Sequence, residues 1–438
     1  MTAVRKLIIV APQFPPSNLA AVHRTRLFAR HLPEMGWEPI VLTVQPDYYE
    51  EELDWNLTQL VPDDLRVERV SALPTEPVRL VGNIGIRSFV PMLRRILKIE
   101  QEESIDFLYL PIPPHFSALL GRIVHWLRGL PYGIDYIDPW VQPQWHPDEK
   151  PLNKHWWTRK SAHVLEPIAV RDASLITGVA EGYYDDVLDR NPHLREQAVT
   201  AAMPYGGEPA DHQAVAEMEA EPYLFDDTED VFRLVYAGAL LPKAREPLER
   251  LMGAIADAPR VFENVRFQFI GTGTSPDDPE GHQVRPVAEK YKVWSKHIEE
   301  QPPRIPYLDA LVHQEAADAV FVLGSTEPHY TPSKVYQGVL AEKPVFAVLH
   351  EASSAGEVLR STGAGHVLTF DGSDGVKRIG RDFADAFARF RSFAADFDPA
   401  QVDRSQFQQY SARSVTQTLA DALDRSIGVP SSAIYDDG

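Results

Sequence analysis

The chain has 438 residues, more than one hydrophobic core usually serves, so two domains are expected before any motif is considered. Its 44% hydrophobic and 24% charged residues are typical of a globular protein. The net charge of −20 argues against a general nucleic-acid-binding protein, and the lack of cysteine excludes disulfides, thiolate catalysis and cysteine-ligated metals.

The beginning of the chain, MTAVRKLIIVAPQFPPS, has a short apolar run that is ended by prolines, which is not the pattern of a signal peptide. No segment of the sequence approaches the ~20 apolar residues that a transmembrane helix needs. These features, together with the absence of cysteine, lead us to expect a cytoplasmic protein.

Residues 1–203 alternate short β-branched runs with longer helical patterns, which is typical of βα units stacked on a parallel sheet. The expected strands are KLIIVAP, EPIVLTV, DFLYLPI, YGIDYID and SLITGV, and the clearest helical stretches are HRTRLFARHLPEM and FSALLGRIVHWLRG. We therefore expect a Rossmann-like, doubly wound α/β domain.

A basic segment at residues 79–98 stands out in this acidic chain. It contains Arg79, Arg87, Arg94, Arg95 and Lys98. Helical spacing places Phe89, Met92 and Ile96 beside or opposite these cations, as in a helix that lies on a membrane surface. One interpretation is a peripheral contact with the inner membrane face, and the other is a basic surface helix packed on its own domain.

Residues 204–230, PYGGEPADHQAVAEMEAEPYLFDDTED, are acidic, punctuated by proline and glycine and poor in strand formers, which predicts a linker. The alternation of strands and helices then restarts over 231–395 with FRLVYAG, VRFQFIG, AVFVLGS, PVFAVL and GHVLTF, which predicts a second Rossmann-like domain. Residues 396–438 read as a C-terminal helix and a tail.

Two strand-to-helix turns of the second domain carry cations. After AVFVLGS, Ser333 is placed to cap a helix that begins with Lys334, and Gln337 follows one turn later. After FRLVYAG, the loop brings Lys243 and Arg245 to the next helix start. Such turns lie at the carboxyl ends of parallel strands, so both suit a phosphate or diphosphate. The alternative is an ordinary helix cap beside exposed lysines.

A third turn, FIGTGTSP, places Gly271 and Gly273 after a strand. This is an incomplete G-x-G-x-x-G pattern, which by itself indicates only a tight turn. Neither a complete dinucleotide fingerprint nor G-x-x-x-x-G-K-[ST] opens the first domain, which argues against NAD-dependent and ATPase functions.

The motifs LVYAGALLPKAREPLERLMGAI and PPRIPYLDALVHQEAADAVFVLGSTEPHYTPSKVYQGVLAEKPVFAVL resemble the donor domain of GT-B glycosyltransferases of family 4. The first half, through LIIVAPQFPPSNLAAVHRTRLFARHLPEMGWEPIVLTV and RDASLITGVAEGYYDDV, resembles their acceptor domain. The resemblance implies two Rossmann-like domains facing a central cleft, the C-terminal helix packing back on the first. It also implies a retaining hexosyltransferase that uses a UDP- or GDP-type sugar donor without a metal or another cofactor.

The resemblance assigns roles on the donor side. Lys243, Arg245, Ser333 and Lys334 match the family's diphosphate-binding positions, and Gly271 and Gly273 join this donor-binding set. Arg304 and Ile305 match the loop that reads the nucleobase, and Glu327 matches an acidic residue near the sugar. Gln337 stands where the family has a glutamate that binds the ribose.

On the acceptor side, the loop PPSNLAAVHR replaces the family's glycine-rich turn, so Ser17, Asn18 and His23 are candidates for acceptor contact. His115 and Asp138 follow expected strands and join Glu327 as candidate catalytic residues. The implied acceptor is a glycan, a lipid-linked sugar or a small molecule, as in polysaccharide biosynthesis, and no nucleic acid is expected.

Two alternatives share this fold. A nucleotide-sugar 2-epimerase would need a carboxylate-rich site for elimination chemistry. A non-catalytic nucleotide-sugar-binding protein fits Gln337 and the altered acceptor loop.

Overall fold

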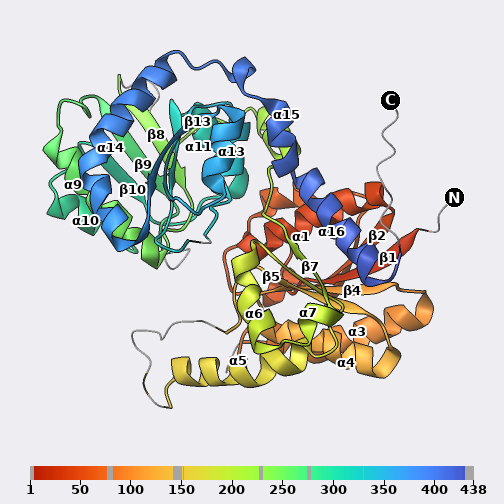
Figure 1. The fold of residues 1–438 in the computed structure, drawn as a ribbon. Helices are drawn as coiled ribbons and strands as arrows, with labels where there is room; N and C mark the ends of the chain where they lie inside the picture. The colour runs from red at the N-terminus through yellow and green to blue at the C-terminus, as the bar shows by residue number, and fades with distance from the viewer. Residues whose placement is uncertain are drawn as a thin grey trace. The chain divides into compact units, whose positions relative to one another are not determined.

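The computed structural model describes residues 4–75, 82–141, 150, 152–225, 230–273, 278–328 and 330–429. The chain divides into two compact units, one made of Met1–Tyr205 with Ala412–Gly438 and the other of Gly206–Ser411 (Figure 1). Each unit is a parallel sheet accompanied by helices, so the predicted pair of Rossmann-like domains is confirmed.

The sheet of the first unit has the order β3-β2-β1-β4-β5-β6-β7, and all its paired strands are parallel. Strands β1 and β4 are almost wholly buried because helices cover both faces of the sheet, which explains their continuous apolar sequences. The strands are β1 (Arg5–Val10), β2 (Trp37–Val44), β3 (Arg66–Val70), β4 (Phe107–Ile112), β5 (Tyr132–Tyr136), β6 (Leu175–Gly178) and β7 (Val199–Ala202).

The helices of this unit form two layers. The α-helices are α1 (Ala20–His31), α2 (Ile84–Arg87), α3 (Phe89–Glu102), α4 (Ala118–Arg128), α5 (Lys154–Val170), α6 (Asp185–Arg190), α7 (Leu194–Gln197) and α16 (Ala412–Ser426). The 3-10 turns are η1 (Leu32–Met35), η2 (Pro46–Tyr48), η3 (Trp55–Leu60), η4 (His115–Ser117) and η5 (Glu181–Tyr183). Helices α3, α4 and α5 share one core cluster with the sheet, and α1 and α16 share another.

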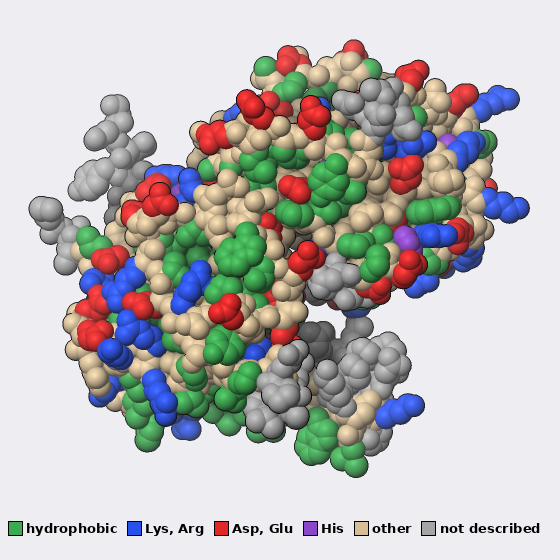
Figure 2. All heavy atoms as spheres, turned by 180° about the vertical axis from the view of Figure 1, so that it is seen from behind, with side chains coloured by type: hydrophobic (Ala, Val, Ile, Leu, Met, Phe, Trp, Pro, Cys, Tyr) green, Lys and Arg blue, Asp and Glu red, His purple; other side chains and the backbone are tan. Residues whose placement is uncertain are grey.

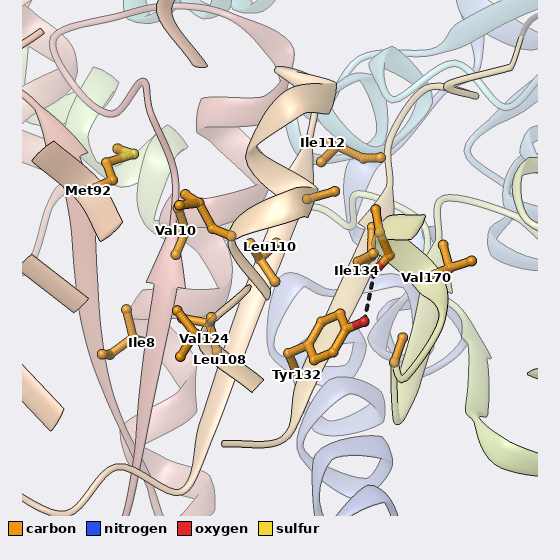
Figure 3. Packing of buried hydrophobic residues seen from close by; sticks show 14 of the residues in the cluster. Ile8, Val10, Met92, Leu108, Leu110, Ile112, Val124, Tyr132, Ile134 and Val170 are labelled. Atoms are coloured by element: carbon orange, nitrogen blue, oxygen red, sulfur yellow. Dashed lines mark hydrogen bonds between the residues drawn. The ribbon is translucent and has the colours of Figure 1, made fainter. Parts of the chain in front are cut away.

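The first of these clusters fills the space between the sheet and the α3–α5 layer. Figure 3 shows Ile8, Leu108 and Ile134 from the strands packed with Met92, Val124 and Val170 from the helices. The Tyr132 hydroxyl donates to the Ala169 carbonyl at 2.7 Å, so its polar end is satisfied within this core.

The second unit has the strand order β10-β9-β8-β11-β12-β13, again parallel. The chain reverses its direction of winding between β8 and β11, and ligands of open α/β sheets bind at the carboxyl ends of strands at such a point. The strands are β8 (Phe232–Ala237), β9 (Val265–Ile270), β10 (Ile298–Gln301), β11 (Ala319–Leu323), β12 (Val345–His350) and β13 (Gly365–Phe370).

Helices of the second unit follow most of these strands. They are α8 (Pro209–Met218), α9 (Arg245–Asp257), α10 (Arg285–Lys290), α11 (Tyr307–Ala316), α12 (Lys334–Leu340), α13 (Ala355–Thr362), α14 (Gly372–Ala395) and α15 (Arg404–Phe407). The 3-10 turns are η6 (Pro242–Ala244), η7 (Pro399–Gln401) and η8 (Gln408–Tyr410).

The predicted linker at 204–230 is wrong for its helical part. Helix α8 begins where the Glu208 side chain accepts from the Ala210 amide. The helix belongs to the second unit, where it packs against α11, and its Asp211 and Val215 are buried. The helix was not predicted because the segment is acidic and few of its residues are buried, so it lacks a clear apolar periodicity. Residues 226–229 of the predicted linker lie outside the described residues.

The C-terminal segment is shared between the two units. Residues up to Ser411, including α15, belong to the second unit, whereas α16 belongs to the first. Leu419 and Leu423 of α16 are buried with Phe28 of α1, and Asp424 accepts from the Trp37 indole at 2.8 Å. The end of the predicted tail, 430–438, is outside the described residues.

The described part of the basic segment near 79–98 is a helix packed on its own domain, the second of the two interpretations of its sequence. Met92 and Ile96 of α3 are fully buried against the sheet, so the apolar stripe belongs to the core. The buried Arg87 donates to the Leu73 and Tyr48 carbonyls and to Glu50. Arg79 lies outside the described residues, and no helix in the described part of the chain is long and apolar enough to cross a membrane.

Candidate functional site

Lys334, the first residue of α12, lies over the turn that follows β8. Gly238 has a φ of +118°, and a Cβ placed on it would lie 2.7 Å from Cε of Lys334. Its backbone conformation therefore favours glycine here, and a larger residue would also displace the end of the lysine side chain. Sequence reasoning missed Gly238, although its position at the end of FRLVYAG was a usable signal.

The Lys334 ammonium is held by a buried tyrosine. Its Nζ donates to the Tyr236 hydroxyl at 2.9 Å and lies 4.2 Å from the centre of the Tyr236 ring. Desolvation, with a smaller contribution from the charge of Arg304, lowers the pKa of Lys334 to about 7. A bound anion would raise the pKa of this lysine again, because the anion stabilises the charged form that burial disfavours.

The turn after β9 lies beside the same glycine. Gly271 has a φ of +72°, and a Cβ placed on it would lie 3.7 Å from Cα of both Gly238 and Arg304. The Gly273 amide donates to the Pro302 carbonyl at 3.0 Å, which ties this turn to the segment carrying Arg304. Ile305, the next residue, packs against the cluster that contains Val235 and Ile270. The structure thus brings Gly271, Arg304 and Lys334 together around Gly238.

Lys243 and Glu327 form an ion pair at 2.7 Å between the loop after β8 and the loop after β11. The Thr326 amide also donates to the Lys243 carbonyl at 3.2 Å, so the two loops are joined by backbone as well. Lys243, which was predicted to bind the diphosphate, and Glu327, which was predicted to lie near the sugar, are therefore neighbours. Arg245 begins α9 with an exposed side chain.

The prediction that Ser333 caps α12 is wrong. Ser333 precedes the helix in a helical conformation, its side chain makes no capping hydrogen bond, and the residue is exposed. The Val335 and Tyr336 amides instead donate to the Pro332 and Ser333 carbonyls. The turn closes on its own backbone, which leaves the hydroxyl unused as a cap.

Gln337 is engaged by other side chains of the second unit. Its Oε1 lies 3.0 Å from His212 Nε2, and its Nε2 donates to the Tyr307 hydroxyl at 2.9 Å. His212 Nδ1 in turn lies 2.6 Å from Glu315, and the Tyr307 hydroxyl donates to Asp211 at 2.8 Å. This set, which we call the Gln337 network, joins α8, α11 and α12, and sequence reasoning missed all its members except Gln337.

In the first unit, His115 and Asp138 are brought together. The His115 ring forms a hydrogen bond with the Asp138 backbone, and its buried Nε2 has no hydrogen-bond partner in the described part of the chain. Desolvation lowers the pKa of His115 to about 4, so the ring is neutral near pH 7 and Nε2 can accept a hydrogen bond from a hydroxyl. The ring stacks on Trp140, with centroids 5.9 Å apart. The Asp138 residue itself is exposed.

The loop after β1 is a network of side chains. Ser17 is fully buried and donates to Glu51, so its hydroxyl supports the loop and does not line an open surface. Asn18 donates to Asp54 at 3.2 Å, and His23 Nε2 lies 2.8 Å from the Asn18 amide oxygen. These contacts replace a glycine-rich turn with a loop held by its side chains.

The described residues contain no group of three or more His, Asp or Glu side chains that could hold a metal ion. The positive charge beyond the ends of β8, β10 and β11 comes from Lys243 and Arg245, Arg304, and Lys334, in that order. Such a set of cations beside two glycine turns is suited to a diphosphate.

Comparisons with known proteins point in the same direction. Residues 20–206 match the family model of the glycosyl transferase 4-like domain, which covers most of the first unit. No curated protein matches the sequence. The first half of the chain is therefore similar to a glycosyl transferase 4-like domain.

Solved structures match both halves at low identity. Alr3699/HepE of Anabaena, in complex with UDP-glucose, has a TM-score of 0.64 and 13% identity over 96% of this chain and 99% of its own. The UDP-forming α,α-trehalose-phosphate synthase of Burkholderia vietnamiensis has a TM-score of 0.65 and 13% identity over 96% and 98%. MnaA of S. aureus, solved with UDP, has a TM-score of 0.52 and 12% identity over 99% and 100%. At this identity the likeness shows the fold.

Proposed function

We propose that this chain, whose residues 20–206 match the glycosyl transferase 4-like domain, is a retaining glycosyltransferase that uses a nucleoside-diphospho-sugar donor. The observation that carries the proposal is the half-buried Lys334, which lies on Gly238 beside Gly271 and Arg304. A cation held this close to two glycine turns at the strand ends fits the diphosphate of a donor.

The chemistry asks for positive charge at this place. As the bond from the anomeric carbon to the diphosphate oxygen breaks, its electrons pass to the leaving phosphate, and the acceptor hydroxyl forms the new bond and loses its proton. Fixed cations stabilise the developing charge without reorganisation. We therefore expect Lys334, Lys243 and Arg245 to make transfer independent of a divalent cation, which activity in EDTA would test.

The neutral His115 supports a role on the sugar side. Its Nε2 lone pair is able to accept a hydrogen bond from a sugar hydroxyl, and its ring is fixed by the Asp138 backbone and Trp140. The acceptor is proposed only as a class: a glycan, a lipid-linked sugar or a small molecule.

A second candidate function, non-catalytic binding of a nucleotide sugar, is favoured by Gln337. Its amide forms hydrogen bonds with His212 and Tyr307, and it stands where a ribose-binding carboxylate was expected. A panel of UDP- and GDP-sugars separates the possibilities. Hydrolysis or transfer is expected for the transferase, formation of an epimer for a 2-epimerase, and calorimetric binding without turnover for a binding protein. Because UDP or UDP-glucose accompanies several of the matched structures, UDP-sugars are tested first.

A further inference from the structure

Exposed hydrophobic side chains gather on three neighbouring helices of the first unit. Among the described residues, six of the twelve large hydrophobic side chains that are exposed belong to α3, α4 or α5: Val90, Trp126, Leu127, Trp157, Val164 and Ile168. Trp126 is 74% exposed and Trp157 is 57% exposed. Helix α4 packs against both α3 and α5, so these side chains share one outer layer. We call it the α3–α5 face.

Helix α5 presents an outward apolar stripe. Trp157, Val164 and Ile168 are separated by seven and four residues, so they lie on one side of the helix. The buried Ala162 and Ala169 occupy the opposite side, against the sheet. A surface helix usually presents polar residues outward, so this stripe is not explained by the core of the unit.

The neighbouring helices repeat this orientation. At 3.6 residues per turn, Trp126 of α4 lies on the side of the helix away from the buried Leu120 and Val124. On α3, the outward positions combine the exposed Val90 with Arg94 and Lys98, four residues apart in succession. Each helix thus buries one face in the core and turns apolar or basic side chains away from it.

The charge of these helices opposes that of the chain. Their sequences contain eight Lys or Arg residues against three Glu, in a protein of net charge −20: Arg94, Arg95, Lys98, Arg122, Arg128, Lys154, Arg159 and Lys160 against Glu100, Glu102 and Glu166. Several are paired, as Arg95 is with Glu68 and Arg122 with Asp172. Figure 2 shows hydrophobic and basic side chains next to one another along the lower margin of this unit.

We propose that the α3–α5 face binds the surface of an anionic lipid bilayer. Tryptophan and aliphatic side chains interleaved with Lys and Arg suit the boundary between headgroups and acyl chains. Basic residues near such a surface each add attraction to anionic lipid headgroups, whereas the same basic face of a second copy would repel them. A peripheral contact of this kind differs from the predicted one at 79–98, because its apolar part comes mainly from α4 and α5.

The test uses the full chain and sedimentation with vesicles of phosphatidylcholine alone or mixed with phosphatidylglycerol. Binding is expected to the mixed vesicles, with a partition coefficient that falls as salt is raised. The Trp126→Glu/Trp157→Glu and Arg94→Glu/Lys160→Glu double variants are each expected to lower that coefficient about tenfold or more. Circular dichroism and the melting temperature check that both variants are folded.

Matched controls lie outside the face. Trp55 is exposed on η3 of the same unit, and Arg260 and Lys296 are exposed in the second unit, so Trp55→Glu and Arg260→Glu/Lys296→Glu should bind vesicles as the wild type does. Failure of the wild type to sediment, or unchanged binding by both face variants, overturns the proposal. A dimer that Trp126→Glu/Trp157→Glu dissociates in light scattering also overturns it, because the face then covers a second copy. None of these outcomes touches the donor-binding assays, so the proposed function stands or falls separately.

Discussion

His212 Nε2 lies 3.0 Å from the Gln337 amide oxygen, which fixes the orientation of a side chain expected to face a ligand. The Gln337 amide nitrogen donates to the Tyr307 hydroxyl, whose own hydrogen is used on Asp211. Each end of the amide therefore has a protein partner of the right polarity. A glutamate at position 337 has no hydrogen to give to Tyr307, so an amide fits this network where a carboxylate does not.

The Gln337 network should be detectable as coupling between two residues. His212→Ala and Gln337→Met each remove one partner, so each should lower the free energy of unfolding, and the double variant should lower it by less than the sum. We expect a coupling of about 0.5–1.5 kcal/mol from denaturant unfolding. His163, an exposed histidine of the first unit, supplies the control pair His163→Ala/Gln337→Met, for which additivity is expected. Additivity in the His212 cycle would contradict the network.

Lys334→Ala should weaken binding of a nucleoside diphosphate by ~1.5–3 kcal/mol, as expected for the loss of a charge-assisted hydrogen bond. Binding of the nucleoside without phosphates should be unchanged, and turnover should fall more than ground-state affinity does, because leaving-group charge grows in the transition state. Calorimetry with the diphosphate decides the first point. Lys296→Ala, at an exposed lysine of the same unit, is the control, and an equal loss in both variants would return Lys334 to an ordinary surface role.

The affinity for an intact nucleotide sugar should depend on pH through Lys334. Desolvation lowers the pKa of Lys334 to about 7, so above pH 7 the amine of the unliganded protein is neutral, and binding the diphosphate must take up a proton. Affinity should therefore be flat below pH 7 and should fall as pH rises above it. Calorimetry with UDP-glucose in buffers of different ionisation enthalpy measures the proton uptake. Lys334→Arg, which stays charged, should abolish both the uptake and the slope.

Glu327→Gln should strengthen binding of UDP. Glu327 neutralises Lys243 at 2.7 Å, and both side chains are partly exposed, so releasing the lysine is worth only about 0.3–1 kcal/mol, or a few-fold in affinity. Turnover should nevertheless fall if the carboxylate contacts the sugar. Glu249→Gln on α9, which removes a partner of Lys290, is the matched control and should change neither quantity. Weaker UDP binding by Glu327→Gln would contradict this prediction. It would show that the ion pair holds Lys243 in the position that binds the diphosphate.

Much of the fold could be predicted because it rests on local periodicity. Buried parallel strands such as β1, β4, β8 and β11 are continuous apolar runs, and their alternation with helices implies doubly wound sheets. The half-exposed edge strand β3 was missed because Arg66–Val70 is largely polar. The helix α8 was missed because its sequence is acidic and only two of its residues are buried.

The sequence by itself determined that Lys334, Lys243 and Gly271 follow strands, and in a parallel sheet all the turns that follow strands lie at one edge. Only the tertiary structure decided which of these side chains touch. Lys334 meets Tyr236 and Gly238 from almost a hundred residues away, and Gln337 meets His212 and Tyr307 on other helices. The direction of the α3 stripe was decided in the same way, because helical spacing shows that Met92 and Ile96 share a face but not whether that face meets a sheet or a membrane. Contacts between distant segments depend on packing, which no local pattern records.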